Sequence, residues 1–285
     1  MGFDITIILV SFNPDYQVLN KCLSSIPEDV QIIIIDNSKN FKKKKIKNFL
    51  KKKIKIFLNN NYGNGQGINF GLEKANSKYV LYLDLDTVLP KNFLENLFKM
   101  VSKIENFAVI APSLEGYKYA INDYKYKADF KQNNEFVEMN YVQGAIMLFN
   151  KDKLKEFNIK FDEKIFLYWE EYDLFKQCKK NNQKIFLLKN VFAYHQGGSS
   201  IDKRMNTDIE LNRNWHYMWS KFYYFKKNFG VIKAYAETLP HFISGFFKLI
   251  IYTILFNQKK NLYYERISGL FFSYLNKPSI RRPKI

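Results

Sequence analysis

Short β-branched runs alternate with helical patterns from Ile5 to about Ile110, and this alternation constrains the fold more than any other feature of the chain. Such an order is typical of an α/β fold. The strand runs are continuously apolar, as in strands that helices bury on both faces, so the sequence predicts a mainly parallel sheet flanked by helices. The expected strands are ITIILVSF, VQIIIID, KIKIFL and YVLYLDLD, and the expected helices cover Tyr16 to Ile26, the Lys-rich segment that begins at Lys42, about Gln66 to Asn76, and Asn92 to Lys103.

The later part of the chain continues this pattern and then changes. After Tyr141, strands are expected in VQGAIMLFN and KIFLL, with a helix from Glu170 to Asn181 between them. The polar, weakly periodic residues from Ser113 to Met139 predict a long connection. From Thr207 onward the pattern is helical, which predicts a helical C-terminal region.

The chain is strongly basic, with 45 Lys and Arg against 27 Asp and Glu and a formal charge of +18. This excess suits anionic partners such as phosphates, nucleic acid or acidic lipid headgroups. A compositional bias of the source genome explains it equally well, because Lys, Asn, Ile, Phe and Tyr are all abundant. In the cluster KKKKIKNFLKKKIK the apolar spacing predicts a helix with one packed and one solvated face, and attraction to acidic lipid is the second interpretation; its apolar members are Ile46, Phe49, Leu50 and Ile54.

The cysteines and the N-terminus indicate the compartment. Cys22 and Cys178 are the two cysteines, far apart and without metal-site spacing. This argues against a disulfide framework or a zinc site and suits a reducing compartment. The chain enters a strand pattern at once, without a basic flank or a small-residue cleavage site, so no signal peptide and a cytoplasmic location are expected.

Two carboxylates, Asp84 and Asp86, lie where the fourth predicted strand ends. Alternate residues of a strand point the same way, so both can converge on one site. Mg²⁺ and Mn²⁺ prefer oxygen ligands and complete their coordination with diphosphate oxygens and water, which makes a metal diphosphate the expected ligand. The other interpretation is a pair of solvent-facing or helix-capping acids. Ser11, Asn13 and Asp36 are expected at the same edge, where ligands of open α/β sheets bind.

The glycine-rich segment NYGNGQGINFG, from Asn61 to Gly71, leads into a predicted helix. Glycine allows close backbone approach, and a helix N-terminus offers N–H groups to an anion, so a nucleotide's diphosphate or sugar is one candidate ligand. The alternative is a turn that only lets the helix pack tightly on the sheet. The spacing is neither GxGxxG nor GxxxxGK, which removes the main support for a dinucleotide or P-loop ATPase site.

The motifs VSFNP, IIDNS, NxGxGxGxNxG, LDLD, GAIMLFNKD, FDEKIFLYWEEYDL and HQGGSS follow one another up to about Ser200. This series resembles the family 2 glycosyltransferases of the GT-A fold, in particular the bacterial rhamnosyltransferase-like branch. The resemblance implies that Asp36 accepts the N3–H of uracil or thymine. It implies donor-binding roles for Ser11, Asn13, Asn61, Gly63, Gly65, Asn69 and Asp84, and a metal site formed by Asp86 with Asp84 and His195.

An inverting glycosyl transfer needs a base that takes the proton of the acceptor hydroxyl. The family has Glu-Asp where this chain has Glu170-Glu171, and the Asp is the family's base, so the resemblance implies Glu171. Its extra methylene moves the carboxylate by about 1.5 Å, which leaves Glu170 and Asp173 as alternatives. The structural interpretation is a helix N-terminus enriched in acids. Tyr168 and Trp169 are candidates for a sugar-stacking wall or for core packing.

The most apolar segment, from Leu239 to Gln258, has about the length of a membrane span, ~20 residues. Lys248 interrupts it and belongs to a narrow polar stripe, which favours a helix that lies in a membrane interface or covers the core over one that crosses a bilayer. Aromatic and basic residues around 215–227, and basic residues at 281–284, are also typical of a membrane-facing surface. The stripe consists of His241, Ser244, Lys248 and Tyr252.

The resemblance implies a catalytic domain over residues 1–206, with a nucleotide-binding half (1–112) and an acceptor half (113–206), followed by a membrane-associating helical region (207–285). It implies transfer from dTDP-rhamnose, or next a UDP-sugar, with Mg²⁺ or Mn²⁺, to a lipid-linked or saccharide acceptor in surface polysaccharide (O-antigen, capsule or cell wall) synthesis. This would occur at the inner face of the cell membrane, without nucleic acid. Two other functions stay open. A sugar-nucleotide nucleotidyltransferase lacks its expected signature at the first strand, and a nucleic-acid-binding protein needs basic and aromatic residues on one groove.

Overall fold

The computed structural model describes residues 4–47, 49–115, 135–197 and 206–283. The chain has two compact units. The sheet unit comprises Met1–Asn60, Gly67–Lys160 and Phe175–Asp202, and the helical unit comprises Asn61–Gln66, Phe161–Leu174 and Lys203–Ile285.

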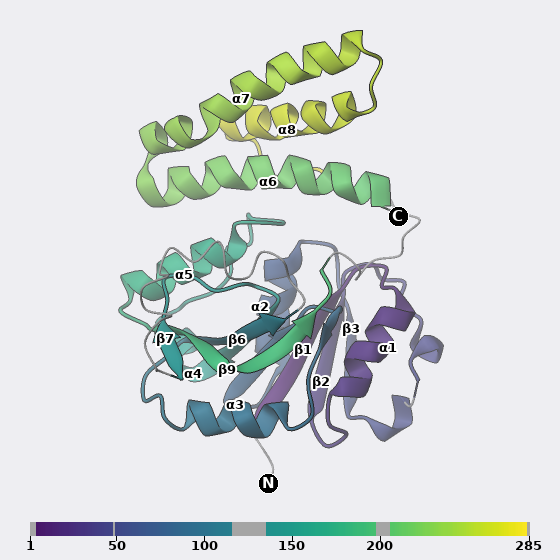
Figure 1. Cartoon of the computed structure of the whole chain (residues 1–285), viewed down its shortest axis with the longest axis vertical. Helices are drawn as coiled ribbons and strands as arrows, with labels where there is room; N and C mark the ends of the chain where they lie inside the picture. The colour runs from purple at the N-terminus through teal and green to yellow at the C-terminus, as the bar shows by residue number, and fades with distance from the viewer. Residues whose placement is uncertain (1–3, 48, 116–134, 198–205, 284–285) are drawn as a thin grey trace. The chain divides into compact units, whose positions relative to one another are not determined.

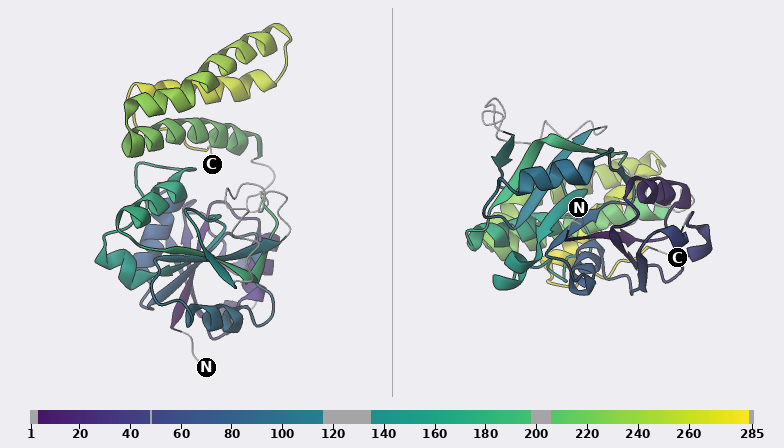
Figure 2. Two further views of the ribbon diagram at one scale, coloured as in Figure 1. Left: turned by 60° about the vertical axis from the view of Figure 1, so that its left-hand side comes forward. Right: turned by 90° about the horizontal axis from the view of Figure 1, so that it is seen from below.

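Within the described residues, the sheet unit contains nine strands in one twisted sheet, ordered β3-β2-β1-β4-β8-β6-β9-β5 with β7 paired to β9 (Figure 1 and Figure 2). The parallel pairs are β1 with β2 and β4, β2 with β3, and β6 with β9. The predicted mainly parallel α/β fold is therefore confirmed. The strands are β1 (Ile5–Ser11), β2 (Gln31–Asp36), β3 (Ile54–Leu58), β4 (Tyr79–Leu83), β5 (Thr87–Val88), β6 (Val109–Glu115), β7 (Phe136–Glu138), β8 (Ile146–Asn150) and β9 (Ile185–His195).

Helices cover both faces of the parallel strands. Leu9 of β1 belongs to the same buried cluster as Leu19 of α1 and Leu97 of α3. The opposite face of β1 presents Ile8, and Gly71 of α2 lies so close to it that an added Cβ would be 2.7 Å from the Ile8 side chain. Successive strand residues alternate between faces, so α1 and α3 cover one face and α2 the other. The helices are α1 (Tyr16–Ser25), α2 (Asn64–Lys74), α3 (Phe93–Val101), α4 (Lys151–Glu156) and α5 (Glu170–Lys180).

The Lys-rich segment after β2 is not the predicted helix. It forms two 3₁₀ turns, η1 (Lys43–Lys45) and η2 (Phe49–Lys51). Ile46 is buried, but Leu50 is 96% exposed, so its described side chains form no continuous packed face. Like charges three and four residues apart repel one another on a helix, and one buried anchor does not offset that repulsion.

Two strand boundaries differ from the prediction. Ser113 continues strand β6 and Phe136 begins β7, so both ends of the expected long connection belong to the sheet, while residues 116–134 lie outside the described part of the chain. Strand β9 extends well beyond KIFLL and ends at His195. This second difference positions the site described below.

From residue 206 to residue 283, the helical unit forms three long helices, α6 (Asn206–Phe229), α7 (Val231–Ile254) and α8 (Lys259–Tyr274), which confirms the predicted helical C-terminal region (Figure 1). The three helices pack around a small core to which α6 contributes Phe222, α7 contributes Ala234 and α8 contributes Leu270. The residues after α8 fold back onto α6. There Nε2 of the buried His216 ring donates to the carbonyl of Arg281 (2.9 Å), and its Nδ1 lies 3.1 Å from Ser279 Oγ. The packing therefore fixes the C-terminal segment.

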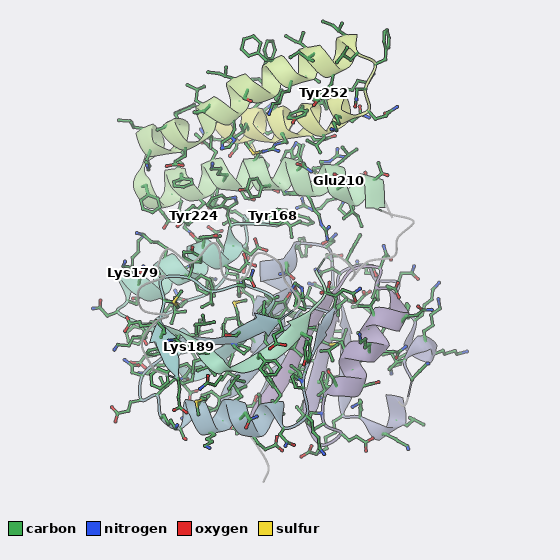
Figure 3. The ribbon with its side chains drawn as sticks, in the orientation of Figure 1. Tyr168, Lys179, Lys189, Glu210, Tyr224 and Tyr252 are labelled. Atoms are coloured by element: carbon green, nitrogen blue, oxygen red, sulfur yellow. The ribbon has the colours of Figure 1, made fainter. Side chains whose placement is uncertain are left out.

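Residues of the polar stripe of α7 contact the neighbouring helices at their edge, although His241, Ser244 and Lys248 are exposed. His241 Nε2 lies 2.9 Å from Lys221 Nζ of α6, and Tyr252 stacks on Tyr263 of α8 with ring centroids 5.5 Å apart. Figure 3 shows side chains projecting from the opposite side of α7. No helix among the described residues is long and apolar enough to cross a bilayer. The exposed apolar face consists of Leu239, Ile243, Phe246, Phe247, Ile250, Ile251 and Ile254, each 42–69% exposed.

Candidate active site

The sheet unit brings together three predicted metal ligands at the carboxyl end of β4. His195 Nε2 lies 3.2 Å from Asp86 Oδ1 and 3.5 Å from Asp84 Oδ2. One ligand atom from each of the three residues lies within 4.8 Å of the others. The Asp86 side chain is 2% exposed and that of Asp84 is 37% exposed, so the cluster is open on the Asp84 side.

Local backbone pairing produces this cluster. The chain leaves β4, turns, and forms the two-residue strand β5, in which Thr87 is the register partner of His195. The N–H of Gln196 also donates to the carbonyl of Asp86 at 3.2 Å. These contacts hold the end of β9 against the two acids. Sequence spacing does not reveal the pairing, because β5 is too short to have a strand pattern of its own.

The electrostatics of the cluster suit a cation. Burial by itself lowers the pKa of His195, but hydrogen bonds and negative charge from Asp84 and Asp86 outweigh it and raise that pKa to about 9. The protonated imidazole therefore neutralises part of the negative charge of the two acids, and it has to release its proton when it coordinates a metal. Two carboxylates and one imidazole are a donor set that Mg²⁺ and Mn²⁺ accept, so these residues fit a divalent metal.

A second group of predicted residues surrounds Asp36 at the end of β2. Ser11 is the register partner of Asp36, and its hydroxyl donates to Asp36 Oδ1 at 2.8 Å. The hydroxyl of Ser38 (2.9 Å) and the N–H of Asn40 (3.1 Å) also donate to this fully buried carboxylate. Asn13, just beyond β1, has a left-handed backbone with φ 43°. Neutral donors therefore hold the Asp36 carboxyl group in place.

Sequence reasoning did not identify several residues that support these groups. Tyr82 donates its hydroxyl to Asp84 Oδ1 at 2.6 Å and so orients that carboxylate. Its position two residues before Asp84 on the same strand face was the available signal. A cavity of about 250 Å³ lies beside Asp86 and His195, and Lys21 of α1 lines it. Lys21 therefore contributes positive charge near the acids.

The glycine-rich segment has the packing role that its sequence left open. Gly63 has φ +109°, and an added Cβ would lie 2.2 Å from the carbonyl oxygen of Phe166, so only glycine fits there. The N–H of Asn64 donates to the same carbonyl at 3.1 Å. An added Cβ at Gly65 would lie 2.9 Å from Phe161. Among the expected donor-binding residues, Asn61, Gly63 and Gly65 belong to the helical unit and Asn69 to the sheet unit.

The three candidate bases lie at the start of α5, in the helical unit, and differ in accessibility. Glu170 is 2% exposed and Asp173 is fully buried, whereas Glu171 is partly exposed. Asp173 accepts hydrogen bonds from Lys227 Nζ (2.7 Å) and Asn228 Nδ2 (2.9 Å) of α6. Its carboxylate is therefore part of a buried ion pair, which leaves Glu171 as the candidate base that solvent reaches.

The two residues before α5 have a strained backbone. Tyr168 and Trp169 have φ 63° and 69°, a conformation that bulky side chains rarely adopt. Aromatic packing holds it, because the Trp169 ring lies 5.3 Å from that of Tyr224 and 5.1 Å from that of Tyr172. Tyr168 and Tyr224 are labelled in Figure 3. Strain of this kind costs about 1–3 kcal/mol per residue and is concentrated at functional sites.

Part of the predicted HQGGSS loop lies outside the described residues. His195, Gln196 and Gly197 are described, and residues 198–205, which include the expected basic residues Lys203 and Arg204, are not. The predicted diphosphate contacts of that loop therefore stay predictions.

Solved structures share this fold at low sequence identity. The mannosyltransferase PcManGT from Pyrobaculum calidifontis, solved with GDP-Man and Mn²⁺, aligns with a TM-score of 0.59 at 11% identity, over 96% of this chain and 88% of that one. GalNAc-T7, solved with UDP, GalNAc and Mn²⁺, aligns with a TM-score of 0.54 at 16% identity, over 67% of this chain, which spans 42% of that structure. The similarity confirms the predicted GT-A fold.

Sequence relatives lead to the same family. An "uncharacterized glycosyltransferase" of Haemophilus influenzae is 25% identical over 263 residues, which cover 86% of this chain and 97% of the relative. The low-salt glycan biosynthesis hexosyltransferase Agl10 of Haloferax volcanii is 21% identical over 209 residues, 67% of each chain. The model of the family "Glycosyl transferase family 2" matches residues 6–161, more than half of the chain. The match includes Asp84 and Asp86, and because it covers more than half of the chain, the chain belongs to glycosyl transferase family 2.

Proposed function

We propose that this protein is a metal-dependent, inverting glycosyltransferase that uses a nucleoside-diphosphate sugar as donor. The observation that carries the proposal is the cluster of Asp84, Asp86 and His195, whose donor atoms lie within 4.8 Å of one another at the end of β4. Two solved proteins of similar fold contain Mn²⁺ together with a nucleotide or nucleotide sugar. When bound, a divalent cation supplies positive charge to the departing nucleoside diphosphate.

In the proposed donor site, Asp36 recognises the base. Its buried carboxylate is held by Ser11, Ser38 and Asn40 and can accept the N3–H of uracil or thymine. Asn13 and Asn69 would add polar contacts to the nucleotide, and Asp84 contacts to the ribose and sugar. The preferred donor is dTDP-rhamnose, on the resemblance to the rhamnosyltransferase-like branch, and UDP-sugars come next.

In the proposed reaction, Glu171 is the base. Its carboxylate accepts the proton of the acceptor hydroxyl while the acceptor oxygen bonds to the anomeric carbon and the bond from that carbon to the diphosphate oxygen breaks. Attack from the side opposite the leaving group inverts the anomeric configuration. The partial exposure of Glu171 supports this role over Glu170 and Asp173, which are buried.

We place the acceptor at an acidic membrane surface on the cytoplasmic side, as part of a lipid-linked or saccharide precursor of surface polysaccharide. The exposed apolar face of α7 supports this placement. Lys248 lies on α7 and Lys259 and Lys260 begin α8, and all three would attract acidic headgroups. A helix that lies in the interface presents such an apolar face to acyl chains and its basic side chains to headgroups.

Incubation of the purified protein with a panel of nucleotide sugars tests the function. Release of nucleoside diphosphate is expected with one thymidine or uridine donor, and only when Mg²⁺ or Mn²⁺ is present. Turnover unchanged after exhaustive chelation would remove the metal from the mechanism. Formation of nucleotide sugar from a sugar phosphate and a nucleoside triphosphate would instead identify a nucleotidyltransferase.

A further inference from the structure

The helical unit contains a cavity that the proposed reaction does not use. Its volume is about 660 Å³, and three segments line it: residues 163–166, part of α6, and residues 273–282. Pockets for small molecules and cofactors have volumes of this order. Every lining residue belongs to the helical unit, so the cavity forms within one compact unit.

The lining of the cavity is strongly basic. Among the described residues that line the cavity, Glu163 is the one acid, against five cationic side chains. In the described part of the chain, only one of these cations is paired with carboxylates: Lys227 lies 2.7 Å from both Asp162 and Asp173. The cationic residues are Lys164, Lys226, Lys227, Lys277 and Arg282.

The contacts of the other cations leave their charge uncompensated. Lys226 donates to the side-chain amide of Asn276, and Lys277 Nζ lies over the ring of Phe272, 5.4 Å from its centroid. The Arg282 guanidinium donates to backbone carbonyls and lies 4.0 Å from the ring centroid of Phe166. These partners are neutral, so an anion in the cavity meets several cations without displacing an acid.

Four aromatic residues also line the cavity, and their polar atoms are already bonded within the protein. The hydroxyl of Tyr223 donates to Asp162 at 2.9 Å, and Nε1 of Trp219 donates to the carbonyl of Lys277 at 3.0 Å. Phe166 and Phe222 are apolar. What these residues offer a ligand is therefore apolar ring surface beside the cations.

We propose that this cavity binds a phosphate or diphosphate group. Lys ammonium groups and an Arg guanidinium are the side chains that proteins use for phosphate oxygens, and partial burial strengthens such contacts. The aromatic lining suits an apolar substituent on the phosphate. We take the ligand to be the diphosphate end of a lipid-linked acceptor, and this choice rests on the proposed function. A soluble phosphate compound is the alternative source of the same chemical group.

Calorimetric titration of the full chain in metal-free buffer tests the assignment. The probes are inorganic pyrophosphate, farnesyl diphosphate, and vesicles of phosphatidylcholine with phosphatidylglycerol. The test variant carries Lys164→Glu and Lys277→Glu, both on exposed side chains. The matched control carries Lys91→Glu and Lys99→Glu, which make the same charge change on exposed side chains outside the cavity lining.

Pyrophosphate and farnesyl diphosphate are expected to bind the wild type, and the test variant is expected to lose at least tenfold in affinity while the control loses less than threefold. Tighter binding of farnesyl diphosphate identifies the lipid-linked source, and equal affinity identifies the soluble one. Binding of neither probe, equal losses in both variants, or binding to vesicles alone overturns the proposal. No sugar donor or metal is present, so a positive result stands even if the protein transfers no sugar.

Discussion

Thr87 and His195 are register partners in the antiparallel pair of β5 and β9, although they lie far apart in the sequence. The pairing places His195 beside Asp86, the residue before Thr87, with Nε2 3.2 Å from Oδ1. Strand β5 has only two residues, and the hydrogen bond from the Gln196 N–H to the Asp86 carbonyl extends its pairing with the end of β9. The geometry of the proposed metal site therefore depends on the continuation of β9 to its last residue.

Asp86→Asn is expected to lower sugar transfer at least about a hundredfold, since the amide keeps the size of the side chain but removes the charge that would bind the cation. Release of nucleoside diphosphate, measured across a titration of Mn²⁺, checks this. The control is Asp29→Asn, which removes the same charge from an exposed residue. Activity like that of the wild type in Asp86→Asn would contradict the proposed metal site.

The parallel half of the sheet could be predicted because its strands are continuous apolar runs, and Asp84 and Asp86 could be paired because alternate strand residues share a face. The contact of Asp86 with His195 was expected only from the family resemblance, because the tertiary pairing that produces it leaves no periodicity in the sequence. The helix predicted for the Lys-rich segment was wrong. Its apolar residues have helical spacing, but its like charges repel one another. The burial of Asp173 could not be predicted either, because its partner Lys227 lies on a helix that is distant in the sequence.

Glu171→Gln is expected to lower kcat by about a hundredfold or more, while the KM for the donor changes little, because the amide binds like the acid but accepts no proton. Glu171→Asp introduces the residue type that the family has at this position, and this variant is expected to retain activity. Glu170→Gln is the adjacent comparison. If Glu170→Gln inactivates the enzyme and Glu171→Gln does not, the base is assigned to the wrong residue.

Asp173→Asn is expected to act on stability instead of on chemistry. The substitution leaves Lys227 with Asp162 as its carboxylate partner and weakens the bond to Asn228, a loss of about 1–3 kcal/mol in the free energy of unfolding. Urea denaturation measures this loss, with Glu210→Gln, an exposed acid on α6, as control. Unchanged stability together with lost transfer would give Asp173 a role in the reaction.

Acidification is expected to destabilise the protein through His216. Burial is the main cause that lowers the pKa of its ring to about 3, and the charges of Arg282 and Arg281 add to it, while the bond to the Arg281 carbonyl opposes them. Below the ordinary histidine pKa of about 6.5 the unfolded chain therefore takes up a proton that the folded chain refuses. Stability falls with decreasing pH at up to about 1.4 kcal/mol per pH unit between these two values.

Unfolding measured between pH 7 and pH 5 checks this, with His216→Gln as the comparison. The variant is expected to be less stable at pH 7 but to lose less stability on acidification, because its side chain does not titrate. Other groups that titrate in the same range contribute equally to both proteins and cancel in the difference. Parallel pH profiles would show that His216 does not control the acid response.

The exposed apolar face of α7 is expected to bind acidic membranes. Phe247, Ile251 and Ile254 are 52–69% exposed and lie at helical spacing on one side. Burial of each in a lipid interface contributes about 1 kcal/mol, so replacing all three by Gln is expected to weaken binding to phosphatidylglycerol vesicles by about a hundredfold. Replacing the exposed Leu50 and Leu58 by Gln is the matched control. Vesicle binding equal to that of the wild type, or loss of a concentration-dependent dimer instead of loss of vesicle binding, would show that lipid is not what covers this face.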